Sequence, residues 1–235
     1  MKHGTLYLIP AFLAETNDER TFPPVNLEVI AGLNSFIAEN VRTARRFLRK
    51  VGYTRDFDQV TFYTLNKHTA MEEASGFIEP LLQGTDVGLL SEAGIPCIAD
   101  PGAVIVEKAH AHGIRVAPLT GPSSIFLALM ASGFNGQHFV FHGYLPIDRK
   151  DREQKIRELE RNAAHLKQTQ IFMETPFRNN QLLEAVLRVC HDDRLLCIAS
   201  MLTHDQLEFI RTQPVGAWKK KPPDLHKKPT VFLLF

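Results

Sequence analysis

The amino-acid sequence predicts an α/β protein of two domains: an N-terminal parallel sheet with flanking helices and a C-terminal sheet that is mixed or antiparallel. The length of 235 residues suits two domains of about 100 to 130 residues each. β-rich runs alternate with helical periodicity in the first half, which is typical of a parallel sheet. Toward the end of the chain the strands are no longer separated by long helices. We place the domain boundary between residues 118 and 119.

The first half contains five apolar runs that are typical of strands. They are GTLYLI at 4–9, SFIAE at 35–39, QVTFYTL at 59–65, DVGLL at 86–90 and IRVAPL at 114–119. The segments with helical periodicity between them are NLEVIAGLN, RTARRFLRKVG, MEEASGFIEPLLQG and AVIVEKAHAHG. Asp100 and Pro101 predict the N-cap and first turn of a helix that ends at Gly113. A further helix is expected between Pro122 and Gly133.

The second half opens with an alternating strand at 138–145, followed by a charged helix at 149–168 that has one apolar face. The strands TQIFME and RLLCIAS then surround a helix that contains Leu182. The segments LEFIRTQPV and TVFLLF are the last predicted strands. Because long helices are missing between these last strands, we expect a mixed or antiparallel sheet.

Composition excludes several classes of protein. Lys and Arg number 27 against 26 Asp and Glu, so no global charge commits the chain to nucleic acid or membrane. The three cysteines, Cys97, Cys190 and Cys197, form no CxxC pair, which argues against a disulfide framework and a structural zinc site. No apolar run approaches membrane-spanning length. We therefore expect a cytoplasmic protein with reduced cysteines and no metal.

Two loops follow strands that the pattern predicts to be neighbours: SEAGIPCIADPG at 91–102 and LTGPSSI at 119–125. Open α/β sheets bind ligands at the carboxyl ends of their strands. Gly94 allows a ligand to approach the backbone closely, and Pro122-Ser123-Ser124 offers helix-start N–H groups and hydroxyls to a carboxylate or phosphate. An ordinary tight turn would explain each loop by itself. The two loops together favour a ligand, although the chain has neither a dinucleotide fingerprint nor a P-loop.

Motifs in the same order resemble those of the tetrapyrrole methylase family of S-adenosylmethionine-dependent enzymes. They are SEAGIPCIADPG, TGPSS, FVFHGYLP and METPFR, with ENVR at 39–42 and LTHDQLEFIR at 202–211. The similarity covers most of the chain. It is greatest to the branch that methylates a ribose 2′-hydroxyl in small-subunit ribosomal RNA. The resemblance implies a tetrapyrrole methylase-like fold, a cofactor held in a cleft between the two domains, and a homodimer.

The resemblance also implies which residues contact S-adenosylmethionine. They are Pro10, Ala93, Gly94, Ile95, Ile98, Ser123, Ser124, Met173, Glu174, Ala199 and Ser200. The chain departs from the family pattern at three places. IPAFLAET at 9–16 replaces a TPIGNL loop, ENVR replaces EDTR, and Met201 and His204 occupy the acid and lysine positions of the C-terminal motif.

Methylation of a ribose hydroxyl calls for a general base, because the hydroxyl is a poor nucleophile until it loses its proton. The candidates for this base are Glu39, Glu92, Glu174 and His204. Arg42 and Arg178 are candidates for holding phosphates. A helix cap or a solvated carboxylate would also explain each acid, and a structural role would explain the histidine. The basic segments Arg42–Lys50 and 219–228 are candidates for contact with RNA. A run of charges on a helix is, however, more often simply a solvent-exposed face.

Three functions remain open at this point. The first is a methyltransferase that acts on small-subunit ribosomal RNA. The second keeps the chemistry but takes a small molecule such as a tetrapyrrole. The third is a cofactor-binding protein that has lost catalysis, which the departures at 9–16, 40–41 and Met201 would suit.

Overall fold

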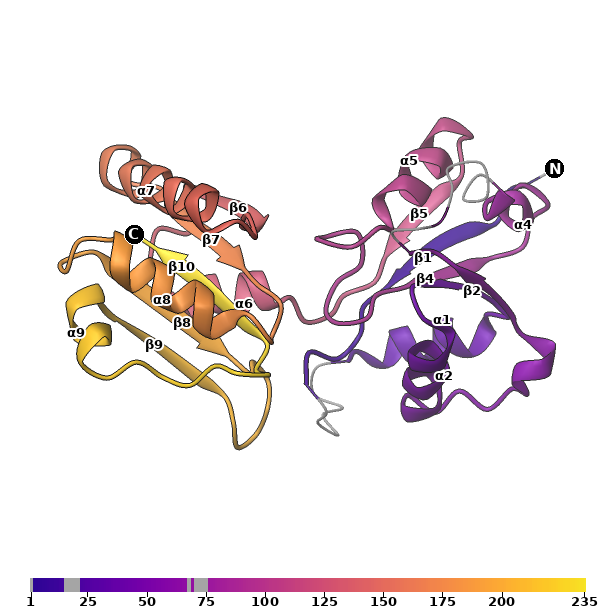
Figure 1. Cartoon of the computed structure of the whole chain (residues 1–235). Helices are drawn as coiled ribbons and strands as arrows, with labels where there is room; N and C mark the ends of the chain where they lie inside the picture. Colours follow the sequence, from indigo (N-terminus) through magenta and orange to yellow (C-terminus); the bar gives the residue numbers. More distant parts are fainter. Residues whose placement is uncertain (1, 15–21, 67–68, 70–75) are drawn as a thin grey trace. The chain divides into compact units, whose positions relative to one another are not determined.

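A computed structural model of the chain describes residues 2–14, 22–66, 69 and 76–235 (Figure 1). The chain divides into two compact units, Met1–Pro122 and Ser123–Phe235. Residues 15 and 16 of the IPAFLAET segment and residues 71–75 of the predicted helix at 71–84 lie outside the described residues.

The first unit contains the parallel sheet that the sequence predicts. Its strands are β1 (Thr5–Ile9), β2 (Ser35–Ala38), β3 (Thr61–Thr64), β4 (Val87–Leu90) and β5 (Arg115–Pro118). Their order is β3-β2-β4-β1-β5, and every pair of neighbours is parallel. The carboxyl ends of β4, β1 and β5 therefore lie next to one another, as do the loops that follow them.

Helices cover both faces of this sheet (Figure 1). They are α1 (Pro24–Gly32), α2 (Val41–Lys50), α4 (Glu79–Leu82) and α5 (Ala103–Ala111), with a 3₁₀ turn, η2, at Phe57–Gln59. Alternate strand residues enter different cores, because side chains alternate across a strand. Leu89 packs in the core that contains residues of α4 and α5, and Leu90 packs in the core that contains residues of α1 and α2.

The prediction that Asp100 caps α5 is wrong. The helix begins at Ala103, with Gly102 as its N-cap residue and no side-chain cap. Asp100 Oδ1 instead accepts hydrogen bonds from Cys97 N (2.8 Å) and Gly102 N (2.9 Å), both in the preceding loop. The predicted end is confirmed, since Gly113 follows the C-cap residue with a φ of +65°.

The second unit contains a mixed sheet, as expected. Its strands are β6 (Phe139–Tyr144), β7 (Thr169–Met173), β8 (Leu195–Ser200), β9 (Phe209–Pro214) and β10 (Thr230–Leu234). Their order is β6-β7-β10-β8-β9, in which β6 and β7 are parallel and the other pairs are antiparallel. The C-terminal strand β10 lies at the centre of the sheet, so β7 and β8 run in the same direction on either side of it.

The helices of the second unit are α6 (Ser124–Ser132), α7 (Arg149–Leu166), α8 (Asn179–Val189) and α9 (Val215–Lys220). Residues of α7, α8 and α9 share one core with β7, β8 and β10, in which Phe172 stacks on Phe232. Trp218 of α9 is buried there and donates a hydrogen bond from Nε1 to Leu196 O. Helix α6 packs against β8, β9 and β10 and ends, as predicted, at Gly133. No described helix is long and apolar enough to cross a bilayer.

Candidate functional site

The loops that follow β1 and β4 are joined by two backbone hydrogen bonds. Ala11 N donates to Gly94 O (2.8 Å), and Gly94 N donates to Ala11 O (3.1 Å). The two strands are neighbours, so this contact lies at the carboxyl edge of the sheet, where α/β proteins bind ligands. The structure thereby brings together Pro10, Ala93 and Gly94, three of the residues assigned to the cofactor.

Two glycines permit a third loop to join this edge. Gly94 has a φ of +72°, and a Cβ atom there would lie 3.4 Å from Pro122 O. A Cβ atom on Gly121 would lie only 2.2 Å from Pro10 Cγ, a distance that side chains do not tolerate. The loop after β5 therefore packs directly on the loops after β1 and β4, and the three form one surface.

The loop from Ser91 to Gly102 stores backbone strain. Cys97 and Ala99 have φ values of +68° and +60°, a conformation that costs non-glycine residues about 1 to 3 kcal/mol each. The two hydrogen bonds accepted by Asp100 hold the loop in this shape. Ile98, between the strained residues, is 47% exposed, and Ile95 is half-buried. These two isoleucines offer apolar surface to a ligand.

Ser123 has an unsatisfied hydroxyl at the start of α6. It is the N-cap residue, yet its side chain makes no cap hydrogen bond. Its Oγ atom is buried and has no hydrogen-bond partner among the residues that the structure describes. Buried polar atoms normally have a partner, so an orphaned one marks a place where a polar ligand group fits. The half-buried Ser124 follows as the first residue of the helix.

In the second unit, the assigned residues gather at one edge of the mixed sheet. Val231 of β10 pairs with Met173 on one side and with Ala199 on the other. Ser200 pairs with Thr230, whose Oγ1 donates to Ser200 Oγ (3.0 Å). The ends of β7 and β8 are thus two strands apart, with the first residues of β10 between them.

Glu174 is paired within its own unit. Its carboxylate is 2% exposed and accepts hydrogen bonds from Arg178 Nη2 (2.7 Å) and Thr175 N (2.6 Å). The candidate base and the candidate phosphate ligand of this unit therefore bind each other. The ion pair stabilises the turn between β7 and α8.

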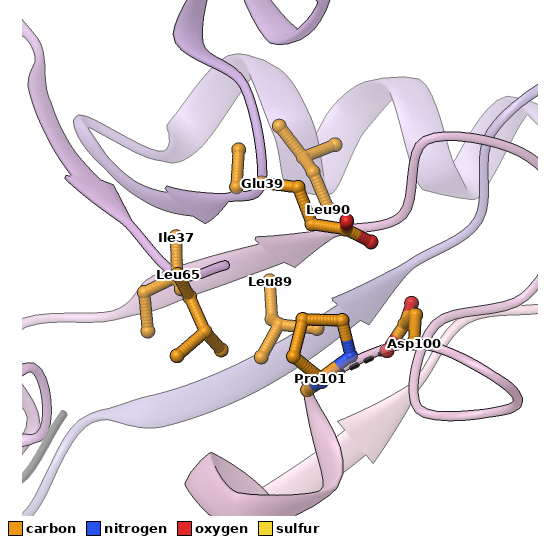
Figure 2. Close-up of a pocket in the computed structure, with 9 residues that line it drawn as sticks. Ile37, Glu39, Leu65, Leu89, Leu90, Asp100 and Pro101 are labelled. Carbon is orange, nitrogen blue, oxygen red and sulfur yellow. Dashed lines mark hydrogen bonds between the residues drawn. The ribbon is translucent and has the colours of Figure 1, made fainter. Parts of the chain in front are cut away.

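A pocket in the first unit contains two carboxylates. It is lined by Ile37, Ala38, Glu39, Leu65, Leu89, Leu90, Asp100, Pro101 and Gly102. Figure 2 shows the carboxylates of Glu39 and Asp100 on the side of the pocket away from Leu65. Burial raises the pKa of the Glu39 carboxyl above its ordinary value, and the negative charges of Asp100 and Glu92 raise it further.

Glu92 belongs to the same group of acids but already has a partner. Its Oε1 accepts a hydrogen bond of 2.6 Å from Thr43 Oγ1 in the first turn of α2. Arg42, the neighbouring residue, is exposed. Glu39 differs from Glu92 because it has no hydrogen bond or ion pair with any described residue.

His204 lies in the turn after β8. Its Nδ1 atom is 3.2 Å from both Gln206 N and Leu207 N, and it accepts from them as a capping group would. Met201, three residues earlier, has a φ of +53°, so the strand ends there. These contacts assign His204 a structural role in the turn through one ring nitrogen.

Two residues at this edge were not among the sequence-predicted site residues. Asp100 was predicted as a helix cap, although it also lines the pocket with Glu39. Asn26 of α1 is fully buried and donates from Nδ2 to Thr120 O (2.8 Å), which connects α1 to the loop after β5. Its Oδ1 has no partner among the described residues. A buried asparagine gives no signal in a single sequence, because its burial depends on the fold.

No group of three or more His, Cys, Asp or Glu side chains that could hold a metal ion occurs in the described part of the chain.

Comparison with protein families gives one model that spans most of the chain. The family described as Tetrapyrrole (Corrin/Porphyrin) Methylases matches residues 20–213. Among solved structures, that of the methyltransferase CobJ is similar over 100% of this chain and 94% of its own, with a TM-score of 0.64 and 19% sequence identity. At that identity the likeness establishes the fold.

Curated relatives carry the name Ribosomal RNA small subunit methyltransferase I. The protein from Escherichia coli O157:H7 is 30% identical over 234 residues, 98% of this chain and 77% of its own length. The protein from Vibrio cholerae serotype O1 is 30% identical over 90% of this chain and 69% of its own. The protein from Bacillus subtilis strain 168 is 32% identical over 88% of this chain and 67% of its own. This chain thus spans about two thirds to three quarters of the length of these relatives.

Proposed function

The chain belongs to the tetrapyrrole (corrin/porphyrin) methylase family, and from this premise we propose that it methylates a ribose 2′-hydroxyl of small-subunit ribosomal RNA with S-adenosylmethionine. The observation that carries the proposal is the carboxyl edge of the parallel sheet, where the loops after β1, β4 and β5 pack together beside Glu39. The names of the relatives support RNA as the substrate.

The residues present fit S-adenosylmethionine. This cofactor carries a positively charged sulfonium, an amino-acid group and a nucleoside, and when bound it supplies an electrophilic methyl group. In the first unit, Pro10, Ala93, Gly94, Ile95 and Ile98 would hold it with backbone groups and apolar side chains. In the second unit, the residues with this role are Ser123, Ser124, Met173, Glu174, Ala199 and Ser200. The unpaired Ser123 Oγ supports this assignment, because a bound polar group would satisfy it.

Glu39 is the strongest of the four candidate bases. A base works best when its pKa lies close to the operating pH, and burial and neighbouring acids raise the pKa of Glu39 in that direction. Its carboxylate has no hydrogen-bond or ion-pair partner among the described residues, so it is available to accept the proton of a ribose hydroxyl. Glu92, Glu174 and His204 each already accept hydrogen bonds within the protein.

The exposed Arg42 would hold an RNA phosphate near Glu39. Arg178 is a weaker candidate for this role, since one of its nitrogens already donates to Glu174. We further propose that the protein is a cytoplasmic homodimer, as the resemblance implies. We place the domain boundary near residue 118 and propose that the cofactor binds in a cleft between the two domains. Light scattering on the purified chain tests the dimer, which should have the mass of two chains.

The decisive experiment measures binding first and transfer second. Calorimetry with S-adenosylhomocysteine reports whether the cofactor site exists. Labelled methyl transfer is then measured to small ribosomal subunits and naked ribosomal RNA from a strain that lacks this protein, with a porphyrin precursor as a parallel acceptor. Methylation of a ribose 2′-oxygen blocks alkaline cleavage, so the label should survive in an alkali-stable dinucleotide.

Each outcome selects one of the three functions. Alkali-stable label in RNA supports the proposal. Transfer only to the small molecule favours a tetrapyrrole substrate, and binding without any transfer favours a protein that has lost catalysis. A chain that binds no cofactor contradicts all three.

A further inference from the structure

Helix α2 presents four arginines on one face. They are Arg42, Arg45, Arg46 and Arg49. The spacing i, i+3, i+4, i+7 places side chains on one side of a helix. All four arginines are exposed, whereas Ala44 and Leu48 on the opposite side are buried. We call this surface the α2 arginine face; Lys50 extends it by one residue.

Among the described residues, no acid neutralises the positive charge of the α2 arginine face. Helix α2 contains no acidic residue, and no carboxylate in the described ranges forms an ion pair with its arginines. Helix α7 also carries several arginines and lysines, but acids lie among them. There Glu153 lies within ion-pair distance of Arg149, Arg157 and Arg188. These α7 arginines thus have a carboxylate partner within the protein, whereas the described residues supply none to the arginines of α2.

Aromatic rings support two of these arginines. The guanidinium carbon of Arg45 lies 5.3 Å from the ring centre of Phe57 and 5.2 Å from that of Phe62. The guanidinium carbon of Arg49 lies 4.0 Å from the ring centre of Phe57. Contacts of this kind hold a guanidinium group in place through its face and leave its edge to hydrogen-bond acceptors. Arg49 Nη1 already donates to Tyr53 O (2.6 Å), which fixes that guanidinium further, so Arg45 has the freer N–H groups of the two. Less conformational entropy is then lost when an anion binds.

The α2 arginine face begins beside the pocket. Glu39 follows β2, Asn40 caps the helix through hydrogen bonds to Arg42 N and Thr43 N, and Arg42 is the first arginine of the face. From there the arginines continue along α2, away from Glu39. A polyanion that lay along the helix would therefore have one end next to the candidate base.

We propose that the α2 arginine face binds the phosphate backbone of the RNA substrate and positions the target ribose toward Glu39. This inference rests on the proposed function, because it takes RNA as the substrate. Arginine side chains bind phosphate oxygens through paired N–H groups, and such contacts position a nucleic acid without reading its sequence. The closeness of the face to Glu39 favours the substrate over an acidic protein partner.

The experiment compares two double variants of the full chain. Arg45→Gln with Arg46→Gln removes two charges from the α2 arginine face. Arg149→Gln with Arg157→Gln removes two exposed charges from α7 and serves as the matched control. Binding of a small-subunit ribosomal RNA transcript is measured between about 50 and 200 mM salt, the range over which phosphate contacts change affinity strongly. Methyl transfer to the same RNA is measured in parallel.

The α2 double variant should bind RNA about tenfold more weakly at low salt. The slope of log binding constant against log salt concentration should become shallower by about one to two, because one to two phosphate contacts are lost. Its KM for RNA should rise while kcat and the affinity for S-adenosylhomocysteine stay unchanged. The control should stay within about twofold of the wild type, because surface ion pairs contribute little. Arg46→Gln alone should weaken RNA binding in the same direction, and in the described part of the chain Arg46, unlike Arg45, lies over no aromatic ring whose contact the substitution would remove.

Equal losses in the two double variants would overturn the inference, since total charge would then explain the binding. It is also overturned if polyglutamate competes as well as RNA of equal charge, because the face would then suit an acidic polypeptide. Unchanged RNA binding in the α2 variant overturns the inference but does not contradict the proposed function. A wild-type chain that neither binds nor methylates RNA contradicts both.

Discussion

Glu39 and Glu174 occupy equivalent positions in the two sheets, yet their surroundings differ. Each is the residue directly after a strand, Glu39 after β2 and Glu174 after β7. Glu174 is almost completely buried and accepts hydrogen bonds from Arg178 and Thr175. Glu39 is half-buried, has no hydrogen-bonding partner among the described residues and faces two other acids. Sequence position therefore does not distinguish a reactive carboxylate from a structural one; the neighbouring charges do.

Glu174 and Glu39 affect the stability of the fold in different ways. A buried carboxylate that has a cationic partner contributes to stability, because removal of either charge leaves the other unpaired. A carboxylate that burial and like charges disfavour does not stabilise the fold, so its presence is explained by function. The first unit thus holds the carboxylate that we propose as the base, and the second unit holds a fixed ion pair.

Among the substitutions considered, Glu39→Gln is expected to lower the rate of methyl transfer most. Loss of the general base should lower kcat for methyl transfer by about 10²- to 10⁴-fold. Calorimetry should show unchanged affinity for S-adenosylhomocysteine, since Glu39 is not among the residues assigned to the cofactor. Wild-type activity in this variant would contradict the role of Glu39 and return attention to Glu92, Glu174 and His204.

The same variant should not be less stable at neutral pH. The pKa of Glu39 is raised in the folded state, so its stabilising contribution is complete below its ordinary value of 4.5 and is lost as the pH rises through the folded-state value. Above the folded-state pKa of Glu39 the ionised side chain is therefore unfavourable, and glutamine removes that cost. Thermal melts of wild type and variant should be similar below pH 4, with the variant equal or higher at pH 7.

Glu174→Gln should instead act on stability. It leaves Arg178 without a counterion, and breaking a buried pair costs about 3 to 5 kcal/mol when both groups are buried. Arg178 is 32% exposed, so we expect a smaller loss of about 2 kcal/mol in the free energy of unfolding, measured by urea denaturation at pH 7. The double variant with Arg178→Met should recover part of this loss. Loss of kcat with unchanged stability would make Glu174, and not Glu39, the reactive acid.

Ser123→Ala tests whether an unsatisfied group marks the cofactor site. The buried Ser123 Oγ has no partner in the described part of the chain, so its removal should leave the free energy of unfolding unchanged or slightly higher. Affinity for S-adenosylhomocysteine should fall by about tenfold, the value of one hydrogen bond. Ser132→Ala, at the other end of α6 and outside the residues assigned to the cofactor, is the matched control. Ser132 Oγ donates to Leu129 O and accepts from Phe134 N, so that variant should lose about 1 kcal/mol of stability and keep its affinity for S-adenosylhomocysteine.

The fold follows from the sequence more fully than the site does. The alternation of strands and helices predicted both sheets, because side-chain periodicity is local and reflects burial directly. Helix α9 was missed, since its six residues are too few to show a period. Glu174 and Arg178 are only four residues apart in the chain, so their pairing could have been anticipated. The grouping of Glu39, Glu92 and Asp100 could not, because it depends on which strands are neighbours.

Asp100→Asn should have the smallest effect on the rate of methyl transfer. It tests whether the charges around Glu39 set the pH dependence of that rate. Asparagine keeps the Oδ1 atom that accepts from Cys97 N and Gly102 N, so the loop should keep its shape. It removes a negative charge that raises the pKa of Glu39, so the acid limb of the pH–rate profile should move to lower pH. On the plateau above the acid limb the rate should stay within about threefold, since the substitution moves the limb and leaves the base in place. Asp151→Asn, on an exposed part of α7, should not move the limb. An unmoved limb in Asp100→Asn would mean that Glu39 does not set the pH dependence.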